Sequence, residues 1–190
     1  MYRRIRFGYA FRRIPLTKGK FAIVDPEDYE RLSRYKWHAV RGSETFYAVR
    51  IGRVSEKRCG KNIWMHRVIL GLDEGVQCDH VNHNGLDNRR ANLRPATHSQ
   101  NMWNRPKTKS NCWSKYKGVS FRIRQQKWVA DIQVHGQPKF LGYFDDEVEA
   151  AKAYDAAARK YHKQYAVLNF KDQESRNIPS WAASKDCVAK

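Results

Sequence analysis

The sequence predicts an α+β chain in two units, and three observations support this fold class. Residues 1–103 alternate short β-like runs with helix-like runs. A polar, basic stretch at 104–114 follows and contains Pro106, which is typical of a linker. Residues 115–170 then present three short alternating runs and one long amphipathic run, which predict a three-stranded antiparallel sheet packed on one helix. The end of the chain, 171–190, is expected to be a loose tail.

The first unit is expected to be a small scaffold of short strands and helices. Residues 1–13 are basic and aromatic, and both a DNA-contacting arm and an edge strand stay open for them. Asp25 followed by Pro26 is typical of a helix start, so a helix is expected over DPEDYERLSRY. The other expected elements are a hairpin with its turn at Lys18–Gly19, two strands around the turn RGSET, and a strand running into a short helix at NIWMHRVILG.

The long run of the second unit, DDEVEAAKAYDAAARKYH, is expected to be a helix. Asp145 is its predicted N-cap, acids fill its first turn and basic residues its last, in agreement with the helix dipole.

The charge of the chain indicates a polyanionic partner. There are 37 Lys and Arg against 19 Asp and Glu, which gives a formal net charge of +18. The excess is concentrated: the stretch from Asn88 to Ala130 holds eleven Lys and Arg without an acid, and residues 1–20 hold seven more. Unbroken runs of one sign repel themselves unless a partner neutralises them, so nucleic acid is the first candidate. A solvated basic surface without such a partner is the alternative.

Cysteine usage and hydrophobicity exclude several classes of protein. The cysteines contain no CxxC pair, which argues against a zinc ribbon and a disulfide framework and fits a reducing compartment: Cys59, Cys78, Cys112 and Cys187. No run approaches the length of a membrane span, and the N-terminus lacks the continuous apolar region of a secretory signal. A protein of the cytoplasm that is not secreted is therefore expected.

The stretch from Asp79 to Asn101 combines residues suited to phosphodiester hydrolysis. Asp79 offers hard oxygen ligands for Mg²⁺ or Mn²⁺. His80 has an ordinary pKa of about 6.5 and can accept a proton at neutral pH. Neighbouring strand residues point to opposite faces, so both can serve one site only at a strand end. The turn-rich VNHNGLDN and the strand-like NLRPAT are expected to bring Asn92 opposite His80.

A short helix is expected to close this stretch. Thr97 and Gln100 have the spacing of a capping box, so the helix that starts there would carry Asn101.

These residues resemble the HNH endonucleases, whose nuclease core is a ββα-metal finger. The likeness lies in order and spacing: Asp79–His80, eleven residues to Asn92, and eight more to Asn101. The preceding MHRVILG resembles the helix found before the motif in phage and intron-encoded members. The resemblance implies that His80 is the general base and that Asn92 orients its ring. It also implies that Asp79 and Asn101 hold one divalent metal ion. Asn101 stands where many members have His, which favours Mg²⁺ over Zn²⁺, with Mn²⁺ as an alternative.

Two alternatives compete with this interpretation. One is a zinc site built from residues close in the sequence: Cys78, His80, His83 and His66. The other is a DNA-binding regulator whose nuclease finger is inactive. Other residues of the stretch are expected to contact phosphates, or else to be solvated, and not to bind a metal: His83, His98, Arg89, Arg90 and Arg94.

The segment from Lys115 to Phe170 resembles the DNA-binding domain of plant ethylene-response factors, the Apetala-two type. The likeness rests on YKGVSFR, KWVADI, LGYFDDEVEAAKAYDAAA and VLNF. It implies a sheet lying in the DNA major groove with a helix behind it. Arginines are usual at Ser120 and Gln133, so the base preference of that family does not carry over. The resemblance implies DNA contacts from the exposed sheet face by Lys117, Arg122, Arg124, Trp128, Gln133 and Lys139.

Together these predictions describe a metal-dependent DNA endonuclease, similar to the mobile, homing-type enzymes of phages and bacteria. An HNH nuclease domain over 1–103, a linker over 104–114 and an Apetala-two-like domain over 115–170 are expected. The predicted partner is double-stranded DNA, bound by a monomer, and neither a membrane nor a small-molecule substrate is expected.

Overall fold

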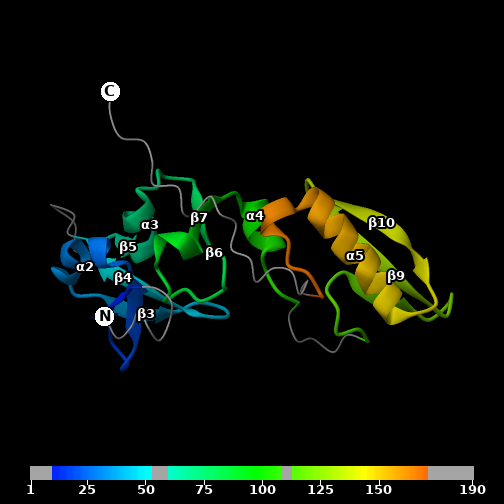
Figure 1. Ribbon diagram of the computed structural model, residues 1–190, viewed down its shortest axis with the longest axis horizontal. Helices are drawn as coiled ribbons and strands as arrows, with labels where there is room; N and C mark the ends of the chain where they lie inside the picture. Colours follow the sequence, from blue (N-terminus) through cyan, green and yellow to red (C-terminus); the bar gives the residue numbers. More distant parts are fainter. Residues whose placement is uncertain (1–9, 53–59, 108–112, 171–190) are drawn as a thin grey trace. The chain divides into compact units, whose positions relative to one another are not determined.

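The computed structural model of the chain describes residues 10–52, 60–107 and 113–170 (Figure 1). It divides into two compact units, Met1–Arg105 and Pro106–Lys190, which are described one at a time. The expectations for the arm before residue 10 and for the tail 171–190 lie outside the described residues. No helix in the described part of the chain is long and apolar enough to span a membrane.

The first unit consists of short elements joined by tight connections. Its strands form the antiparallel sheets β1–β2, β3–β4–β5 and β6–β7. The predicted turn at Lys18 and Gly19 is confirmed, with φ of 60° and 62°. In chain order the elements are β1 (Arg12–Pro15), β2 (Phe21–Val24), α2 (Pro26–Ser33), β3 (His38–Arg41), β4 (Phe46–Ile51), β5 (Asn62–Trp64), α3 (Met65–Leu70), β6 (Gln77–His80), the 3₁₀ turn η1 (Arg90–Asn92), β7 (Leu93–Ala96) and α4 (His98–Trp103).

One apolar core joins the N-terminal scaffold to the later strands of the unit. Its members come from six elements and the connection after α2, and burying them supplies most of the favourable free energy of folding. The core contains Ile14, Ala22, Val24, Leu32, Trp37, Ala48, Met65, Ile69 and Leu93.

The free edge of β2 holds the loop between β6 and β7. The Ile23 amide donates to the Leu86 carbonyl (2.8 Å), and the Asn88 amide donates to the Ile23 carbonyl (2.7 Å). Ile23 and Asp87 thus form a parallel bridge. The scaffold therefore fixes a loop that lies about sixty residues later in the sequence.

Asp25 precedes α2 as predicted, but its side chain does not cap that helix. The Asp25 carboxylate accepts a hydrogen bond from the Arg90 amide instead (2.8 Å). This contact is a second tie between the scaffold and the loop that leads into β7.

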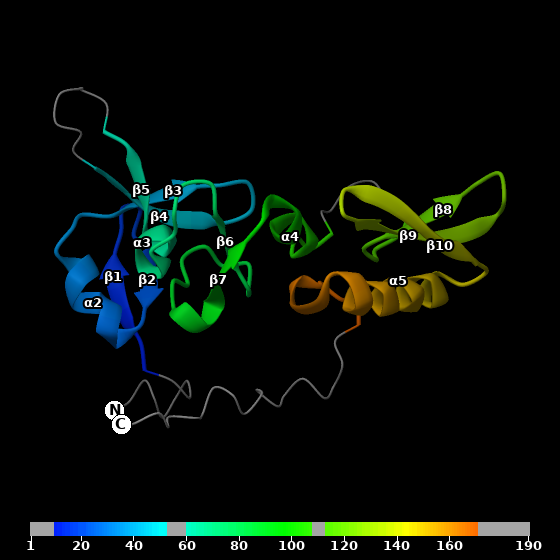
Figure 2. The same ribbon diagram turned by 90° about the horizontal axis from the view of Figure 1, so that it is seen from above.

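The second unit is a three-stranded antiparallel sheet with one helix on one face (Figure 2). Its elements are β8 (Val119–Arg122), β9 (Lys127–Val134), β10 (Gln137–Phe144), α5 (Glu147–Tyr161) and the 3₁₀ turn η2 (Lys163–Tyr165), with the strands in the order β10–β9–β8. The small antiparallel sheets and few helices of both units confirm the predicted α+β class.

The N-cap of α5 is Asp146, so the prediction of Asp145 was wrong by one residue. Asp146 Oδ1 accepts hydrogen bonds from the amides of Val148 (2.7 Å) and Glu149 (3.0 Å). Asp145 pairs with Lys127 instead. An N-cap side chain must reach the amides two and three residues on, and in this chain Asp146 has that position.

Asp155 ties the end of the second unit to α5. Its carboxylate is 2% exposed and accepts hydrogen bonds from the amides of Asn169 (2.8 Å) and Phe170 (2.9 Å). Asn169 in turn accepts a hydrogen bond from the Lys117 amide (2.6 Å). The beginning and end of the unit are thus held together through one buried carboxylate.

Candidate active site

Strands β6 and β7 and helix α4 carry the residues singled out from the sequence. β6 pairs with β7 so that Asp79 lies opposite Arg94 and His80 opposite Leu93. Asn92 is therefore one position away from the predicted pairing. The capping box at the start of α4 is confirmed, with both of its reciprocal hydrogen bonds between Thr97 and Gln100 present.

Asp79 is 5% exposed and has two partners. Its Oδ2 accepts a hydrogen bond from Arg94 Nε (2.7 Å) and forms a salt bridge with Arg94 Nη2 (2.6 Å). Its Oδ1 receives Asn104 Nδ2 (2.8 Å), which also donates to the His80 carbonyl (3.2 Å). Asn104 is the C-cap of α4 and is 5% exposed, so it belongs to this site and not to a linker.

Helix α4 lies along β6 in a defined register. Asn101 Nδ2 donates to Gln77 Oε1 (2.8 Å) and to the Cys78 carbonyl (3.5 Å). Gln77 and Asp79 share one face of the strand, and Asn101 and Asn104 lie one turn apart on the helix. Asn101 therefore faces Gln77 while Asn104 faces Asp79. No hydrogen bond joins Asn101 to Asp79 in the described structure, although the two were predicted to share a metal ion.

His80 is 6% exposed and lies on the other side of β6 from Asp79. Its Nε2 is 3.4 Å from Oδ1 of Asn88, which is fully buried. The rings of His66 and Tyr47 pack edge-on against the imidazole, at centroid distances of 5.2 Å and 5.7 Å. Burial lowers the pKa of His80, while Asn88 and the charge of Asp79 act in the opposite direction. The net effect favours a neutral ring, which is the form a general base needs.

Asn92 does not orient His80 in the structure, contrary to prediction. Its Oδ1 accepts from the Asn82 amide (2.9 Å), and its Nδ2 donates to the Asp87 carbonyl (2.7 Å). Buried peptide groups of a loop need partners, and the Asn92 amide supplies two of them. The contact predicted for Asn92 is made by Asn88, a residue that the sequence analysis did not single out.

His66, at the start of α3, was considered only as a zinc ligand. It is 9% exposed, and its Nδ1 is buried without a hydrogen-bond partner. Burial, with smaller effects from His80 and Arg67, lowers its pKa to about 3. Its ring also contacts Trp64 at a centroid distance of 5.8 Å. His66 is therefore an uncharged side chain whose ring packs against His80.

Gly85 lets the loop approach Tyr47 closely. A Cβ at this position would lie 2.6 Å from both the Phe46 carbonyl oxygen and the Tyr47 ring. The Gly85 amide donates to Thr45 Oγ1 (3.1 Å). Because Tyr47 also contacts His80, the glycine keeps the loop, the aromatic ring and the imidazole in one packed group.

The oxygen donors of the site suit a hard divalent cation. The Asn101 Nδ2 is held by Gln77, while its Oδ1 makes no hydrogen bond in the described structure. Asn104, which donates to the Asp79 carboxylate, lies one turn after Asn101 at the end of α4. Mg²⁺ takes few protein oxygens and keeps several waters, so Asp79 with one amide oxygen is a sufficient set. In this structure Arg94 neutralises the Asp79 charge, and Asn104 donates a hydrogen bond to the carboxylate.

The zinc alternative is not supported. In residues 10–52, 60–107 and 113–170, no three His, Cys, Asp or Glu side chains gather as metal ligands. Burial, with the charge of Asp79, raises the pKa of the Cys78 thiol to about 12, whereas zinc binds the thiolate.

The three arginines predicted to contact phosphates are each paired with a carboxylate. These carboxylates are nearly inaccessible, at 3–5% exposure, and a buried charge needs a counter-charge. Each guanidinium is thus engaged by a carboxylate, and the phosphate contacts of these side chains stay a prediction. The pairs are Arg89–Asp87 (2.6 Å), Arg90–Asp28 (2.9 Å) and Arg94–Asp79 (2.6 Å).

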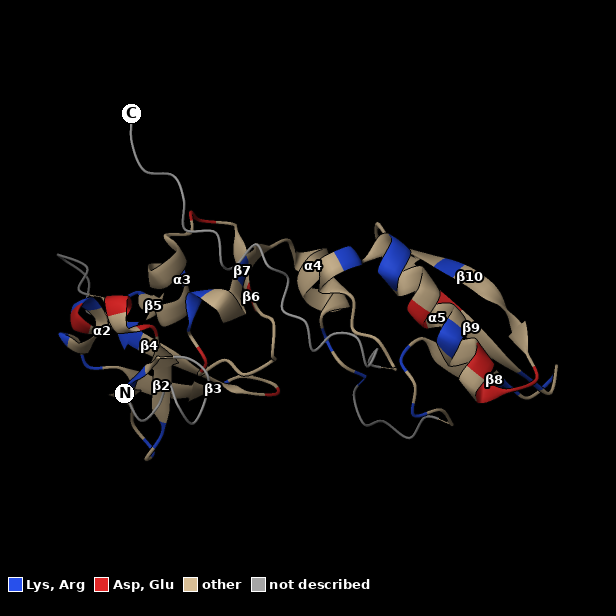
Figure 3. Ribbon diagram, viewed as in Figure 1, with Lys and Arg blue, Asp and Glu red and all other residues tan. Residues whose placement is uncertain are grey.

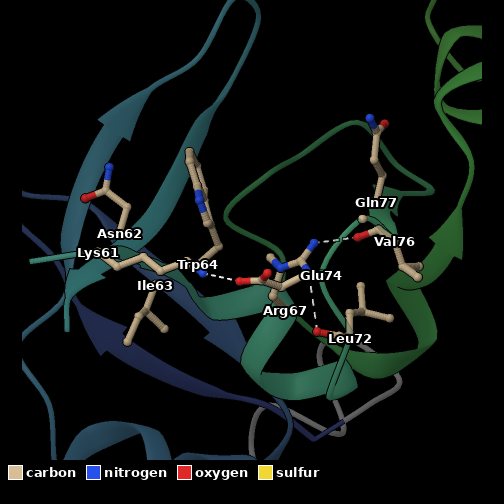
Figure 4. Close-up of a pocket in the computed structure, with 10 residues that line it drawn as sticks. Lys61, Asn62, Ile63, Trp64, Arg67, Leu72, Glu74, Val76 and Gln77 are labelled. Atoms are coloured by element: carbon tan, nitrogen blue, oxygen red, sulfur yellow. Dashed lines mark hydrogen bonds and ion pairs between the residues drawn. The ribbon is translucent and has the colours of Figure 1, made fainter. Parts of the chain in front are cut away.

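Arg67 organises the segment that leads into β6. Its guanidinium donates to the carbonyls of Val76 (2.5 Å), Asp73 (2.6 Å) and Leu72 (3.3 Å), as Figure 4 shows in part. A pocket of about 660 Å³ lies here and is lined by Trp64 and Gln77 among others. Gln77 links this pocket to Asn101, so Arg67 supports the site from outside.

In the second unit, two of the predicted DNA contacts lie on the helix side of the sheet. Trp128 packs against the core that Val119, Ala130 and the α5 alanines form. Lys139 Nζ donates to the Tyr161 hydroxyl on α5 (2.9 Å). The expectation that both lie on the exposed sheet face was therefore wrong.

The remaining predicted residues of this unit differ in exposure. Arg122, Arg124 and Gln133 are exposed. Arg122 and Arg124 line a pocket of about 550 Å³ together with Tyr143. Lys117 is partly buried, and burial lowers its pKa to about 8.

Comparisons with known proteins agree with both resemblances. Residues 63–103 match a family described as HNH endonuclease. A protein of Acanthamoeba polyphaga mimivirus named as an uncharacterised HNH endonuclease is 30% identical over 158 residues, which cover 80% of this chain and 76% of the viral protein.

The C-terminal region matches plant transcription factors. The AP2/ERF and B3 domain-containing transcription factor RAV1 of Arabidopsis thaliana is 46% identical over 59 residues, 31% of this chain and 17% of that protein. Dehydration-responsive element-binding protein 2D of the same plant is 45% identical over 71 residues, 36% of this chain and 34% of that protein. These matches show an AP2/ERF-type region. The match to the viral protein extends over most of both chains, and by this likeness the present chain belongs to the HNH endonuclease family, the DNA nucleases built on this motif.

Proposed function

We propose that this nuclease is metal-dependent and that His80 is its general base. The observation that carries the proposal is the buried His80 imidazole, held between Asn88, His66 and Tyr47 at the end of β6. A ring held this firmly can take the proton of the attacking water with little reorganisation. Asn88 fixes the ring orientation, the role that Asn92 was expected to have.

Asp79 and the Asn101 oxygen are proposed to hold one divalent ion, with Mg²⁺ as the preferred metal. Such an ion, when bound, stabilises the negative charge that develops on the scissile phosphate and the leaving oxygen. Asn104 keeps the Asp79 carboxylate in place, and Gln77 keeps the Asn101 oxygen turned away from the strand.

The second unit is proposed to hold double-stranded DNA near the cleavage site, in a homing-type enzyme that acts as a monomer. Its likeness to AP2/ERF transcription factors and its exposed Arg122 and Arg124 support this role. The competing function is a DNA-binding regulator whose nuclease site is inactive.

Plasmid cleavage separates these two functions. The wild-type chain is expected to nick or cut plasmid DNA with Mg²⁺ or Mn²⁺ and to lose all cleavage in excess EDTA. Asp79→Asn removes one hard ligand charge and is expected to lower the rate at least tenfold, with partial recovery at high Mg²⁺. Binding without cleavage under any divalent metal would favour the regulator.

The DNA-binding role of the second unit is tested by two charge-matched double variants. Arg122→Gln/Arg124→Gln is expected to weaken DNA binding. The slope of log K against log salt should fall by the equivalent of up to about two phosphate contacts. Lys152→Gln/Lys160→Gln removes the same charge from the exposed side of α5 and is expected to change affinity less than about twofold. Equal effects of the two pairs would reject a specific role for Arg122 and Arg124.

A further inference from the structure

The β1–β2 hairpin and its neighbour β3 carry cations that have no carboxylate partner in the part of the chain that the structure describes. The first acid in the sequence is Asp25, so all charged residues of the hairpin are Lys or Arg (Figure 3). In the described part of the chain, the salt bridges involve other residues. The cations of this region that have no carboxylate partner among the described residues are Arg12, Arg13, Lys18, Lys20 and Arg41.

Three of these cations lie against aromatic rings, of which Phe21 is exposed and Phe46 half-buried. Lys20 Nζ lies 4.1 Å from the centroid of Phe46, and the Arg41 guanidinium lies 5.9 Å from the same ring. Arg13 lies 5.9 Å from the centroid of Phe21, whose side chain is 49% exposed. Stacking holds a cation extended without occupying its N–H groups, so the charge stays available for an external acceptor. We call Arg13, Lys20, Phe21, Arg41 and Phe46 the hairpin surface.

The hairpin surface and the candidate active site lie on opposite sides of β4 within one unit. Phe46 and Tyr47 are neighbours on β4 and therefore point to opposite faces. The Phe46 ring contacts Lys20, while the Tyr47 ring contacts His80. The free edge of β2 also holds the loop that carries Asn88. Both faces belong to one unit, so their spacing is fixed by a packed core.

We propose that the hairpin surface binds the phosphate backbone of the DNA beside the cleavage site. This proposal rests on the proposed function for its substrate. The nuclease unit would then bind DNA independently of the second unit. This surface is also separate from the arginines that pair with Asp28, Asp79 and Asp87. Duplex DNA carries one negative charge per about 1.7 Å of axis, so it is complementary to an array of separated, unpaired cations. The exposed Phe21 ring adds contact area for sugar groups.

The test compares two double variants of the full chain. Lys20→Gln/Arg41→Gln removes two cations of the hairpin surface. Arg34→Gln/Lys61→Gln removes two cations of the same unit that pair with Glu30 and Glu74. Affinity for a labelled duplex is measured by fluorescence anisotropy in EDTA over a range of salt concentrations, so that binding is read without cleavage.

The hairpin variant is expected to bind at least tenfold more weakly. Its slope of log K against log salt should fall by about 0.9 for each lost phosphate contact, or about 1.8 for two. The control should stay within about twofold of wild type. Equal affinities of both variants, or equal losses, would overturn the proposal. A further variant, Arg13→Gln/Lys18→Gln, covers the case in which the first pair lowers the melting temperature. If the chain never cleaves DNA but the hairpin variant still binds more weakly than the control, the proposed nuclease function is rejected and DNA binding by the hairpin surface is retained.

Discussion

Replacing His80 by alanine is expected to lower the cleavage rate at saturating DNA by about 10²–10⁴-fold, the usual contribution of a positioned general base. His66, the other histidine of the ring cluster, has a pKa lowered to about 3 by burial and is too weak a base. The expected loss lies in the chemical step, so single-turnover cleavage with saturating enzyme and Mg²⁺ is the measurement.

His38→Ala is the matched control, because His38 is an exposed histidine on β3 of the same unit. It should cut and bind like wild type, and His80→Ala should bind like wild type. If His80→Ala cut at the wild-type rate, His80 would not be the base, whatever the nuclease activity of the chain.

The same assignment fixes the sign of the pH dependence. A base acts when it is deprotonated, so the rate should rise with pH through the pKa of His80 and then level off. Burial lowers that pKa, so the rise should be centred below the ordinary value of about 6.5. His80→Ala should lose this rise. A wild-type profile centred at or above 6.5 would contradict a neutral, buried base.

The parts of the site that follow from local sequence were predictable. The capping box of α4, the turn at Lys18 and Gly19 and the strand that ends in Asp79 and His80 depend on residues close together in the chain. Short-range rules describe such features well. The order of elements in both units could be derived in the same way.

The partners of the site residues depend on long-range docking, which the sequence does not encode in any short pattern. Several asparagines lie between residues 82 and 104. Asn88 lies on His80 because β2 holds the loop at Ile23. Asn104 lies on Asp79 because α4 runs along β6 in one particular register. Neither contact could be chosen from spacing alone.

Charge patterning does not show which cations have a carboxylate partner, for a related reason. An arginine has the same appearance in a sequence whether or not a carboxylate neutralises it. Arg90 was predicted to contact phosphate, yet its partner Asp28 comes from the other end of the unit. Conversely, Lys20 and Arg41 were not singled out, and they stay without a carboxylate partner among the described residues. Only the fold distinguishes paired from unpaired cations.

Replacing Gly118 by alanine is expected to destabilise the second unit by about 2–5 kcal/mol, the second large effect. A Cβ there would lie 2.0 Å from the Tyr154 ring and 2.7 Å from the Asp131 carbonyl oxygen. The residue also has φ of +71°, which adds backbone strain for alanine. Overpacking typically costs about 1–3 kcal/mol and an unfavourable φ about 1 kcal/mol or more. A unit of this size is expected to have only about 3–8 kcal/mol in total.

Gly136→Ala separates the two contributions. Gly136 has φ of +80°, but a Cβ there would meet no atom within 4 Å. It should therefore show the strain alone, about 1 kcal/mol. Hydrogen exchange measured by mass spectrometry on the full chain gives the readout for each unit. Gly118→Ala should speed exchange over 115–170 and leave 10–105 protected, because the units have separate cores. Faster exchange in both would mean that the nuclease unit depends on the second unit for its stability. If only 115–170 loosened, metal-dependent cleavage should persist with weaker DNA binding, since every residue assigned to the chemistry lies before Pro106.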